Sequence, residues 1–543
     1  MIHGLHFRNL KGDVFGGLTT AVVALPLALA FGVASGAGPV AGLYGAIFVG
    51  LFAALFGGTP AQVSGPTGPM TVVMATVFVQ FADNPAIAFT VVMLAGLFQI
   101  GFGVARIGRY INFVPFPVIS GFMSGIGVII IVLQLAPLIG QSTPPGGVLI
   151  VAAALPGLVQ TTVADAIIVG LVALAIVFLT PGRIARIVPP PLIALTAGTL
   201  LVACFLGGAP VLGDIPSGFP ELQAPEIDIH LLSEIVGASL VLALLGSIDS
   251  LLTSLIADNV TQTHHNSDRE LIGQGIGNFF AGLFGAIPGA GATMRTVVNV
   301  RAGGRTPISG ALHALVLLAI VLGLGPLASH IPHAVLAGIL MKVGIDIIDW
   351  DYLRRARNAP RAGLLFMAVV LLLTVLVNLI VAVGVGIVLA SLLFVKRMSD
   401  LQLANIREIN SATPHDVPLG EEERALLDEL GSRVVLYHLS GPFTFGAAKE
   451  MAKRMSEADR YDILILDLTS VPMIDSSASM AIEDVVKLSQ HRGHPVYLVG
   501  LSDRVTRVLQ KIGVLSVVGP EHQFVSMLES LRAAANELDT PQV

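Results

Sequence analysis

The sequence predicts an α-helical polytopic membrane protein that carries a small cytoplasmic α/β domain at its C-terminal end. Of its 543 residues, 54% are apolar and only 12% are charged, and the mean hydropathy of +0.83 does not fit a soluble chain. Apolar stretches close to the roughly 20 residues that a bilayer span needs recur throughout residues 14–395. After Arg397 the composition becomes polar, and strand-like runs alternate with helix-like runs.

The composition also excludes several classes of protein. The net charge of −6 is small, and no dense block of Lys and Arg could follow a phosphate backbone, so nucleic acid is excluded as a partner. The single cysteine, Cys204, excludes an intramolecular disulfide, and no Cys/His spacing resembles a structural zinc site. No small-residue cleavage site follows the N-terminal tail, which we expect to stay attached.

The apolar runs and the Gly and Pro residues that interrupt them give about fourteen candidate membrane segments. Their centres lie near Leu25, Phe48, Val73, Leu94, Gly125, Val169, Leu195, Leu244, Gly277, Val297, Leu318, Ile339, Val370 and Ile387.

Basic residues predict the orientation of these segments, because positively charged loops stay in the cytoplasm. The predicted outer stretches 82–85, 139–160, 208–230 and 326–333 contain no Lys or Arg. The predicted inner loops carry Arg106, Arg109, Arg183, Arg186, Arg269, Arg301, Arg305, Arg354, Arg355, Arg357 and Arg361, and Lys396 and Arg397 follow the last segment. The loops with Arg183 and Arg305 fall on the cytoplasmic side only if the short segments beside them are not each counted as a full span. The asymmetry predicts that both termini are cytoplasmic.

Two short, interrupted segments resemble each other, S-G-P-T-G-P-M-T-V-V at 64–73 and G-A-G-A-T-M-R-T-V-V at 289–298. They occupy the third and tenth places, and because the separation of seven segments is odd, the two halves of the chain would have opposite orientations. This predicts inverted repeats, about 13–205 and 231–397, whose broken half-helices meet at the midplane.

Two facing half-helices would form an anion site. A helix N-terminus has about four unpaired N–H groups and roughly half a positive charge, so it attracts an anion without a full formal charge. The alternative is that these glycines only allow close helix packing. Packing is the better explanation for any single glycine, whereas the matched pair favours an anion site.

Asp249 lies deep in the eighth segment, where an ionisable group costs at least about 2.5 kcal/mol to insert. Thr253 follows one helical turn later, so both side chains lie on the same face. This oxygen pair suits a hard cation such as Na⁺, whereas a lone carboxylate could carry a proton. Arg295, early in the tenth segment, could attract the anion or neutralise Asp249, and the sequence leaves both roles open. For Lys342 we favour snorkelling toward an interface.

The polar C-terminal part predicts an α/β domain over 421–543, joined by a linker over 401–420 to the membrane part over 1–400. Strand-like runs cover 433–439, 462–468 and 495–500, and helical patterns cover 447–456, 477–490, 504–512 and 525–537. No phosphate loop, nucleophile elbow or metal spacing occurs there, so we expect a regulatory or structural role. Ser476 and Ser477 are candidate regulatory residues at a helix start, where capping is a better explanation than phosphorylation.

Together, several motifs make the full chain resemble the SulP anion transporters, and within that family the BicA-type group of bacterial sodium-dependent bicarbonate transporters. The tail resembles the STAS domain of that family, with D-S-S-A at its helix start. The motifs span nearly the whole chain and are specific in combination: H-F-R-N-L-K-G-D-V-F-G-G-L-T, G-P-T-G-P-M-T-V-V-M, S-G-F-M-S-G-I-G, D-S-L-L-T-S, H-N-S-D-R-E-L-I-G-Q-G-I-G-N, G-A-G-A-T-M-R-T-V-V-N and K-V-G-I-D-I-I-D-W.

The resemblance implies 14 transmembrane segments in a 7+7 inverted repeat, with a core domain that carries the anion past a gate domain, and a homodimer in the bacterial inner membrane. It implies a sodium site at Asp249 and Thr253. Arg295 is similar to an arginine found in other anion-transporting members. The anion site that the resemblance implies contains Thr67, Gly68, Pro69, Met70, Ala292, Thr293 and Met294, with Arg295 beside them.

We therefore expect a secondary active transporter rather than an enzyme. Its substrate would be a small inorganic anion, bicarbonate first, taken up together with a sodium ion by an elevator-type mechanism. The protein would be surrounded by membrane lipid and would need no cofactor. Three alternatives remain open: a sulfate or dicarboxylate transporter that is proton-coupled or an exchanger, an anion channel, and a membrane scaffold whose tail recruits partners.

Overall fold

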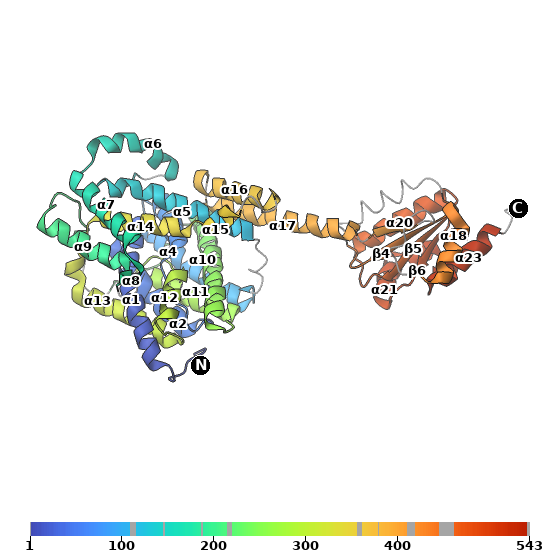
Figure 1. Cartoon of the computed structure of the whole chain (residues 1–543), viewed down its shortest axis with the longest axis horizontal. Helices are drawn as coiled ribbons and strands as arrows, with labels where there is room; N and C mark the ends of the chain where they lie inside the picture. Colours follow the sequence, from blue (N-terminus) through green and yellow to red (C-terminus); the bar gives the residue numbers. More distant parts are fainter. Residues whose placement is uncertain are drawn as a thin grey trace. The chain divides into compact units, whose positions relative to one another are not determined.

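The computed structural model describes residues 2–108, 116–144, 147–185, 188–213, 220–355, 361–377, 379–404, 406–409, 419–444 and 461–539. Arg109, Arg186, Arg357 and the predicted helix 447–456 lie outside the described residues. The chain divides into two compact units, Met1–Val388 and Leu389–Val543, each visible in Figure 1.

The first unit is largely helical, and every segment centre predicted from the sequence lies inside one of its helices or in α17. Its elements, with α17 continuing into the second unit, are α1 (Leu10–Ala34), α2 (Pro39–Phe56), β1 (Ser64–Gly65), α3 (Gly68–Gln80), α4 (Pro85–Val104), α5 (Phe116–Leu138), α6 (Val148–Leu158), η2 (Val159–Thr161), α7 (Ala164–Leu179), α8 (Gly182–Ala185), α9 (Pro190–Cys204), η3 (Ile229–Leu231), α10 (Leu232–Thr261), α11 (Ser267–Leu283), β2 (Ala290–Gly291), α12 (Thr293–Arg301), α13 (Pro307–Ala328), α14 (His333–Ile347), α15 (Trp350–Arg354), α16 (Arg361–Leu376) and α17 (Leu379–Ala404).

By length and composition, five helical stretches in the described ranges could cross a membrane: α1, α2, α4, α5 and η3 with α10. A sixth would be the pair formed by α6–η2 and α7, which is bent by 119°. The sequence prediction counted α7 but placed α6 in an outer stretch. Half-helices were expected at the third and tenth places, and α3 and α12 are indeed short, with 13 and 9 residues.

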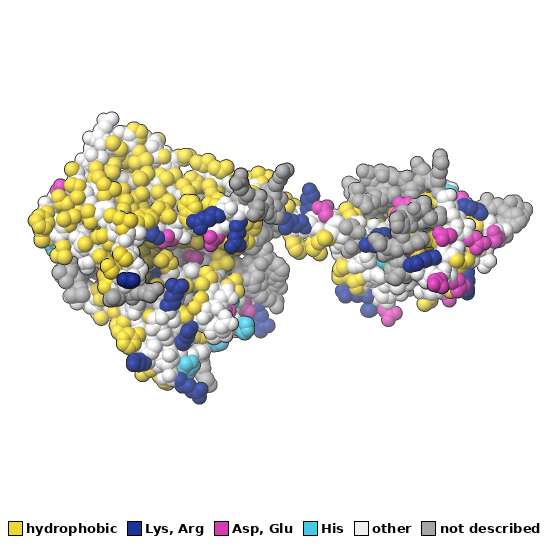
Figure 2. Space-filling model, in the orientation of Figure 1, with side chains coloured by type: hydrophobic (Ala, Val, Ile, Leu, Met, Phe, Trp, Pro, Cys, Tyr) yellow, Lys and Arg dark blue, Asp and Glu magenta, His cyan; other side chains and the backbone are white. Residues whose placement is uncertain are grey.

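Hydrophobic side chains cover much of the visible face of this unit (Figure 2). Leu179 is 76% exposed and Leu200 is 64% exposed, for example. A soluble protein rarely exposes apolar area on this scale, so these side chains face lipid. The unit is therefore a multi-pass membrane protein, as the composition predicted.

The helices of the first unit form two bundles. In the first, which we call the ribbon bundle, α1–α4 pack with α10–α13. In the second, the α5/α14 bundle, α5 packs on α14 and α16, and α7 packs on α14 and α9. The ribbon bundle contains matched contacts: α4 packs on α11 as α13 packs on α2, and α1 packs on α13 as α10 packs on α4. In each comparison, a helix of one contact is replaced in the other by the helix that lies seven predicted segments before or after it.

The second unit contains a five-stranded sheet in the order β3-β4-β5-β6-β7, in which β3 is antiparallel and the other strands are parallel. The three predicted strands are present as β4, β5 and β6, and three predicted helices are present as α20, α21 and α23. Its elements are β3 (Ile406–Ile409), α18 (Glu421–Leu430), η5 (Gly431–Arg433), β4 (Val434–Ser440), β5 (Ile463–Ser470), α20 (Ser476–His491), β6 (Val496–Val499), α21 (Asp503–Ile512), α22 (Val514–Val518), η6 (Pro520–His522), β7 (Gln523–Phe524) and α23 (Met527–Asp539).

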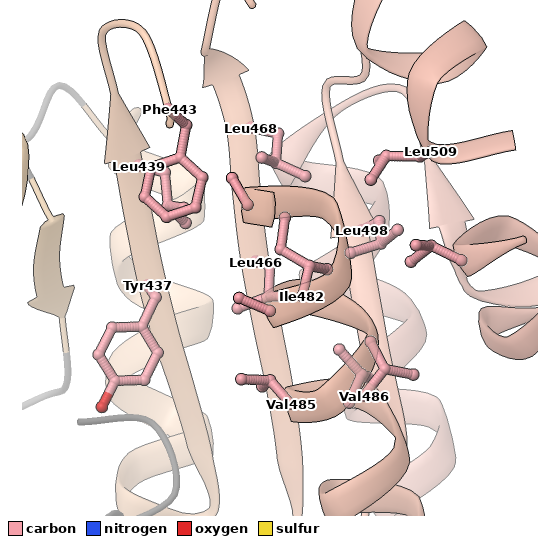
Figure 3. Close-up of a cluster of buried hydrophobic side chains, with 14 of the residues drawn as sticks. Tyr437, Leu439, Phe443, Leu466, Leu468, Ile482, Val485, Val486, Leu498 and Leu509 are labelled. Carbon is pink, nitrogen blue, oxygen red and sulfur yellow. The ribbon is translucent and has the colours of Figure 1, made fainter. Parts of the chain in front are cut away.

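Both faces of this sheet are covered. Figure 3 shows one face, where Leu466 and Leu498 pack against Ile482 and Val486 of α20 and near Leu509 of α21. On the other face, strand side chains pack against residues of α18 and α23. Parallel strands need burial on both sides, which explains why their sequences are almost continuously apolar.

Two details of this unit differ from the sequence prediction. Part of the predicted linker is ordered structure, because residues 401–404 continue α17 and Ile406–Ile409 forms the edge strand β3. The predicted capping by Ser476 and Ser477 is wrong. Asp475 caps α20, because its carboxylate precedes the helix and accepts a hydrogen bond from the Ala478 N–H at 2.8 Å. The two serines are exposed in the first turn.

Candidate substrate-binding site

A short antiparallel ribbon brings the N-termini of α3 and α12 together. Ser64 pairs with Gly291, and Gly65 pairs with Ala290. Backbone groups buried inside a helical bundle need partners, and the two broken segments supply them to each other. A Cβ on Gly289 would lie 2.4 Å from the carbonyl carbon of Gly65, so only glycine permits this approach. The ribbon joins segments more than 200 residues apart in the sequence.

On the α3 side, Thr67 is the N-cap residue, and its hydroxyl donates a hydrogen bond to Oδ2 of Asp249 at 2.8 Å. Gly68 begins the helix, and Pro69, in its first turn, lacks an N–H. Met70 is fully buried. A Cβ on Gly68 would lie 2.7 Å from Cδ1 of Ile347. The start of α3 is therefore close to the α5/α14 bundle.

On the α12 side, Ala292 is the N-cap residue and Thr293 begins the helix. The hydroxyl oxygens of Thr293 and Thr253 are 2.8 Å apart, and the Thr253 hydroxyl donates to the Gly291 carbonyl at 2.9 Å. Met294 points away from the interior, with 56% of its surface exposed. The structure thus brings together Thr67 with Asp249, and Thr253 with Thr293.

Arg295 is buried and connects the two half-helices. Its Nη2 donates to the Pro66 carbonyl at 2.6 Å, while Nη1 has no hydrogen-bond partner among the described residues. No ion pair within 4.0 Å joins Arg295 to Asp249, both of which are described. The guanidinium therefore joins α12 by a hydrogen bond to Pro66, the residue before the N-cap of α3. The Nη1 amino group remains available as a donor.

Helix α11 holds this site in place through residues to which the sequence analysis gave no role. The buried Glu270 carboxylate accepts hydrogen bonds from the Gly58 and Thr59 N–H groups, both at 2.9 Å, and from the side chains of Gln62 and Gln274, both at 2.8 Å. Four donors of this kind stabilise an ionised carboxylate.

The same face of α11 holds both strands of the ribbon. Gln274 donates to the Ser64 hydroxyl at 2.5 Å, and Asn278 exchanges two hydrogen bonds with the Gly289 backbone. The signal was present in the sequence, because Glu270, Gln274 and Asn278 are spaced four residues apart within one quoted motif and so share a helix face. Lys342, in contrast, pairs with Asp346 one turn away.

Half-helices that meet inside a helical membrane bundle are characteristic of membrane transporters. The sulfate permease family model matches residues 10–370, and the STAS domain model matches residues 429–530. The chain belongs to the sulfate permease family and carries a C-terminal STAS domain.

Similar proteins align with nearly the whole chain. The bicarbonate transporter BicA of Picosynechococcus sp. is 48% identical, over 98% of this chain and 95% of that protein. The putative sulfate transporter YvdB of Bacillus subtilis is 32% identical, over 96% of this chain and 97% of that protein. The solved transmembrane domain of a cyanobacterial bicarbonate transporter BicA is 52% identical, covers 70% of this chain and 100% of that domain, and gives a TM-score of 0.68.

Proposed function

We propose that the protein takes up bicarbonate together with sodium. The observation that carries this proposal is the Thr67–Asp249 hydrogen bond, because it links the cap of an anion-attracting half-helix to the carboxylate of a cation site. The 48% identity to a bicarbonate transporter supports bicarbonate as the anion.

The anion would bind between the N-termini of α3 and α12. The first N–H groups of each helix have no partner within their own helix, and the partial positive charges of the two helix starts would add there. Among the predicted residues, Thr67, Gly68 and Thr293 would contribute chiefly backbone donors, whereas the Ala292 N–H already donates to the Val63 carbonyl at 2.9 Å. The Met70 and Met294 side chains are placed for packing or exposure rather than for binding an anion.

Sodium would bind next to the anion. The ligands would be the Asp249 carboxylate, which the Thr67 hydroxyl contacts, and, one helical turn later, the Thr253 hydroxyl with its neighbours, the Thr293 hydroxyl and the Gly291 carbonyl. All are oxygens, as hard cations require. A bound sodium ion would offset the negative charge of the carboxylate. Anion and sodium should therefore raise each other's affinity, because such coupling is reciprocal.

An elevator-type movement would carry both ligands across the membrane. All the proposed ligand residues belong to the ribbon bundle, which would be the core domain, and the α5/α14 bundle would be the gate domain. The bundles meet near a cavity of about 10 Å³ whose lining includes Phe31, Ile130, Leu133 and Leu340. Apolar side chains have few directional contacts to break, which favours sliding.

The matched helix contacts in the ribbon bundle support a 7+7 inverted repeat of 14 segments. Together with the distribution of arginines, this repeat would place both termini in the cytoplasm of a bacterial cell with the protein in the inner membrane. We further propose a homodimer.

Sulfate transport is the second candidate function. A putative sulfate transporter is 32% identical over nearly the whole chain, and the free Nη1 donor of Arg295 could serve a divalent anion. A proton would then replace sodium on Asp249.

Uptake into proteoliposomes tests the proposal. Labelled bicarbonate and sulfate are supplied with and without an inward sodium gradient, at constant pH and membrane potential, to the wild type, Asp249→Asn and the exposed control Asp351→Asn. We expect sodium-stimulated bicarbonate uptake that is lost in Asp249→Asn and retained in the control. Uptake that is unchanged when choline replaces sodium would overturn the coupling, and preference for sulfate would overturn the substrate.

A further inference from the structure

A second cavity, of about 220 Å³ and with a mixed polar and apolar lining, lies in the ribbon bundle away from the half-helices. The N-terminal tail, the loop before β1, the end of α10 and the loop before α13 form its walls. All of these elements belong to the first unit, and none comes from the α5/α14 bundle. The cavity would therefore move with the ribbon bundle instead of lying on the path between the bundles.

Two basic side chains, Arg305 and His6, line this cavity. Neither side chain makes a hydrogen bond or an ion pair with any other residue in the part of the chain that the structure describes. Thr59, Thr261 and Thr263 add hydroxyl groups to the lining. Among the described residues, no carboxylate lines the cavity.

The acidic groups next to the lining already have partners, as Glu270 does. Asp13 accepts hydrogen bonds from the Arg305 and Thr306 N–H groups, at 2.7 and 2.9 Å, and from the Thr306 hydroxyl at 2.8 Å. Asp258 pairs with His265 at 2.7 Å. The backbone of Arg305 is thus fixed to α1 while its guanidinium is left without a partner.

The N-terminal tail, which forms one wall of the cavity, packs closely against the loop before β1. Gly4 has a φ of +67°, and a Cβ there would lie 2.4 Å from Cγ of Pro60. Farther along the tail, Asn9 donates to the Gly303 carbonyl at 2.8 Å. The tail therefore forms one wall of the cavity and is held by specific contacts, while Gly4 and His6 themselves are exposed.

We propose that this cavity is an accessory oxyanion site, bound by Arg305 and His6 and separate from the site between α3 and α12. Its ligand is a small oxyanion, either a free inorganic ion or the phosphate of a lipid headgroup. A volume of about 220 Å³ is below the 300–1,000 Å³ typical of drug-sized ligands, which favours an ion with part of its hydration shell or a headgroup. This binding does not depend on which anion is transported.

The cavity is connected to the proposed transport site. The Thr59 hydroxyl is 2.7 Å from that of Ser254, which also donates to Gln62 at 3.0 Å, and Gln62 bonds to Glu270. Ala257, in the lining, follows Thr253 by one turn of α10, about 6 Å along the helix axis. Occupancy of the cavity would therefore act on the loop that leads into β1.

Equilibrium dialysis with labelled phosphate in sodium-free detergent tests the site, on an Asp249→Asn background that weakens the proposed transport site. Arg305→Gln should weaken binding by about tenfold or more, since a charge-assisted hydrogen bond contributes roughly 1.5–3 kcal/mol and 1.4 kcal/mol is tenfold. Arg301→Gln, an exposed change four residues away, is the matched control and should leave binding unchanged. Gly4→Ala should weaken binding by displacing the tail wall.

A second arm distinguishes the two sources of the oxyanion. In nanodiscs, phosphatidylglycerol should compete with phosphate if a lipid headgroup is the natural ligand, whereas phosphatidylcholine alone should not. Arg305→Lys keeps the charge and should retain part of the binding if Arg305→Gln fails to fold. Equal loss in Arg305→Gln and Arg301→Gln, or no saturable binding of phosphate or phosphatidylglycerol, would overturn the proposal. Bicarbonate uptake by Arg305→Gln tests the transport function separately.

Discussion

Thr67 provides both a backbone cap and the side-chain hydrogen bond to Asp249. Its φ of −123° is far from the value of about −65° that proline imposes. Thr67→Ser should transport nearly as well as the wild type, because the hydroxyl remains. Thr67→Ala should lower uptake and raise the sodium requirement, and Thr67→Pro should be lowest, because it also removes an N–H donor. Initial uptake rates across a sodium titration provide the measurement, and equal rates for the alanine and proline variants would argue against backbone donors.

Asp249 and Arg295 are oppositely charged, buried and not in contact within 4.0 Å. Breaking a buried ion pair by removing one partner costs roughly 3–5 kcal/mol, and removing both partners recovers much of that cost. Here we expect no such recovery, because Arg295 donates to the Pro66 carbonyl instead. Thermal unfolding of Asp249→Asn, Arg295→Gln and the double variant gives the coupling energy. A double variant more stable than both single variants would show that the pair exists in the membrane.

At the scale of elements, the β1–β2 ribbon fixes how the half-helices face each other. In Gly289→Ala the new Cβ would meet the Gly65 backbone, which cannot rotate away as a side chain can. We expect a loss of stability of about 1–3 kcal/mol and a large fall in uptake. Gly237→Ala is the matched control, because a Cβ at that position in α10 meets nothing within 4 Å. Comparable uptake by the two variants would refute a positioning role for the ribbon.

At the scale of the whole molecule, the proposed site lies entirely in the first unit, so the STAS domain should not choose the anion. Truncation after Ala404 should lower expression or oligomer stability, while the ratio of bicarbonate to sulfate uptake stays the same. Size-exclusion chromatography and uptake with both anions provide the measurements. Ser476→Ala with Ser477→Ala is a full-length control and should have little effect, because Asp475 supplies the cap. A changed ratio on truncation would exclude a site confined to the membrane unit.

The sequence was enough to locate every predicted membrane helix and three strands of the C-terminal sheet, because apolar periodicity depends on local spacing and on burial. Helices α6 and α18 and the strands β1, β2, β3 and β7 were not predicted. Every predicted membrane centre lies in a helix, and β4, β5 and β6 are where continuous apolar runs placed them. It also identified the matched segments that begin α3 and α12, since glycine, proline and small residues are required wherever backbone turns inside a membrane.

Which polar groups meet depends on how distant helices pack. A two-residue strand has no readable period, so the ribbon and its register could not be predicted. Glu270 could not be assigned a role, because its donors, Gly58, Thr59 and Gln62, are more than 200 residues away in the chain. The two roles left open for Arg295 depended on a distance of a few ångströms. Hydrogen bonds and ion pairs form only within such a distance. The separation of two side chains on different helices is fixed only when those helices pack together.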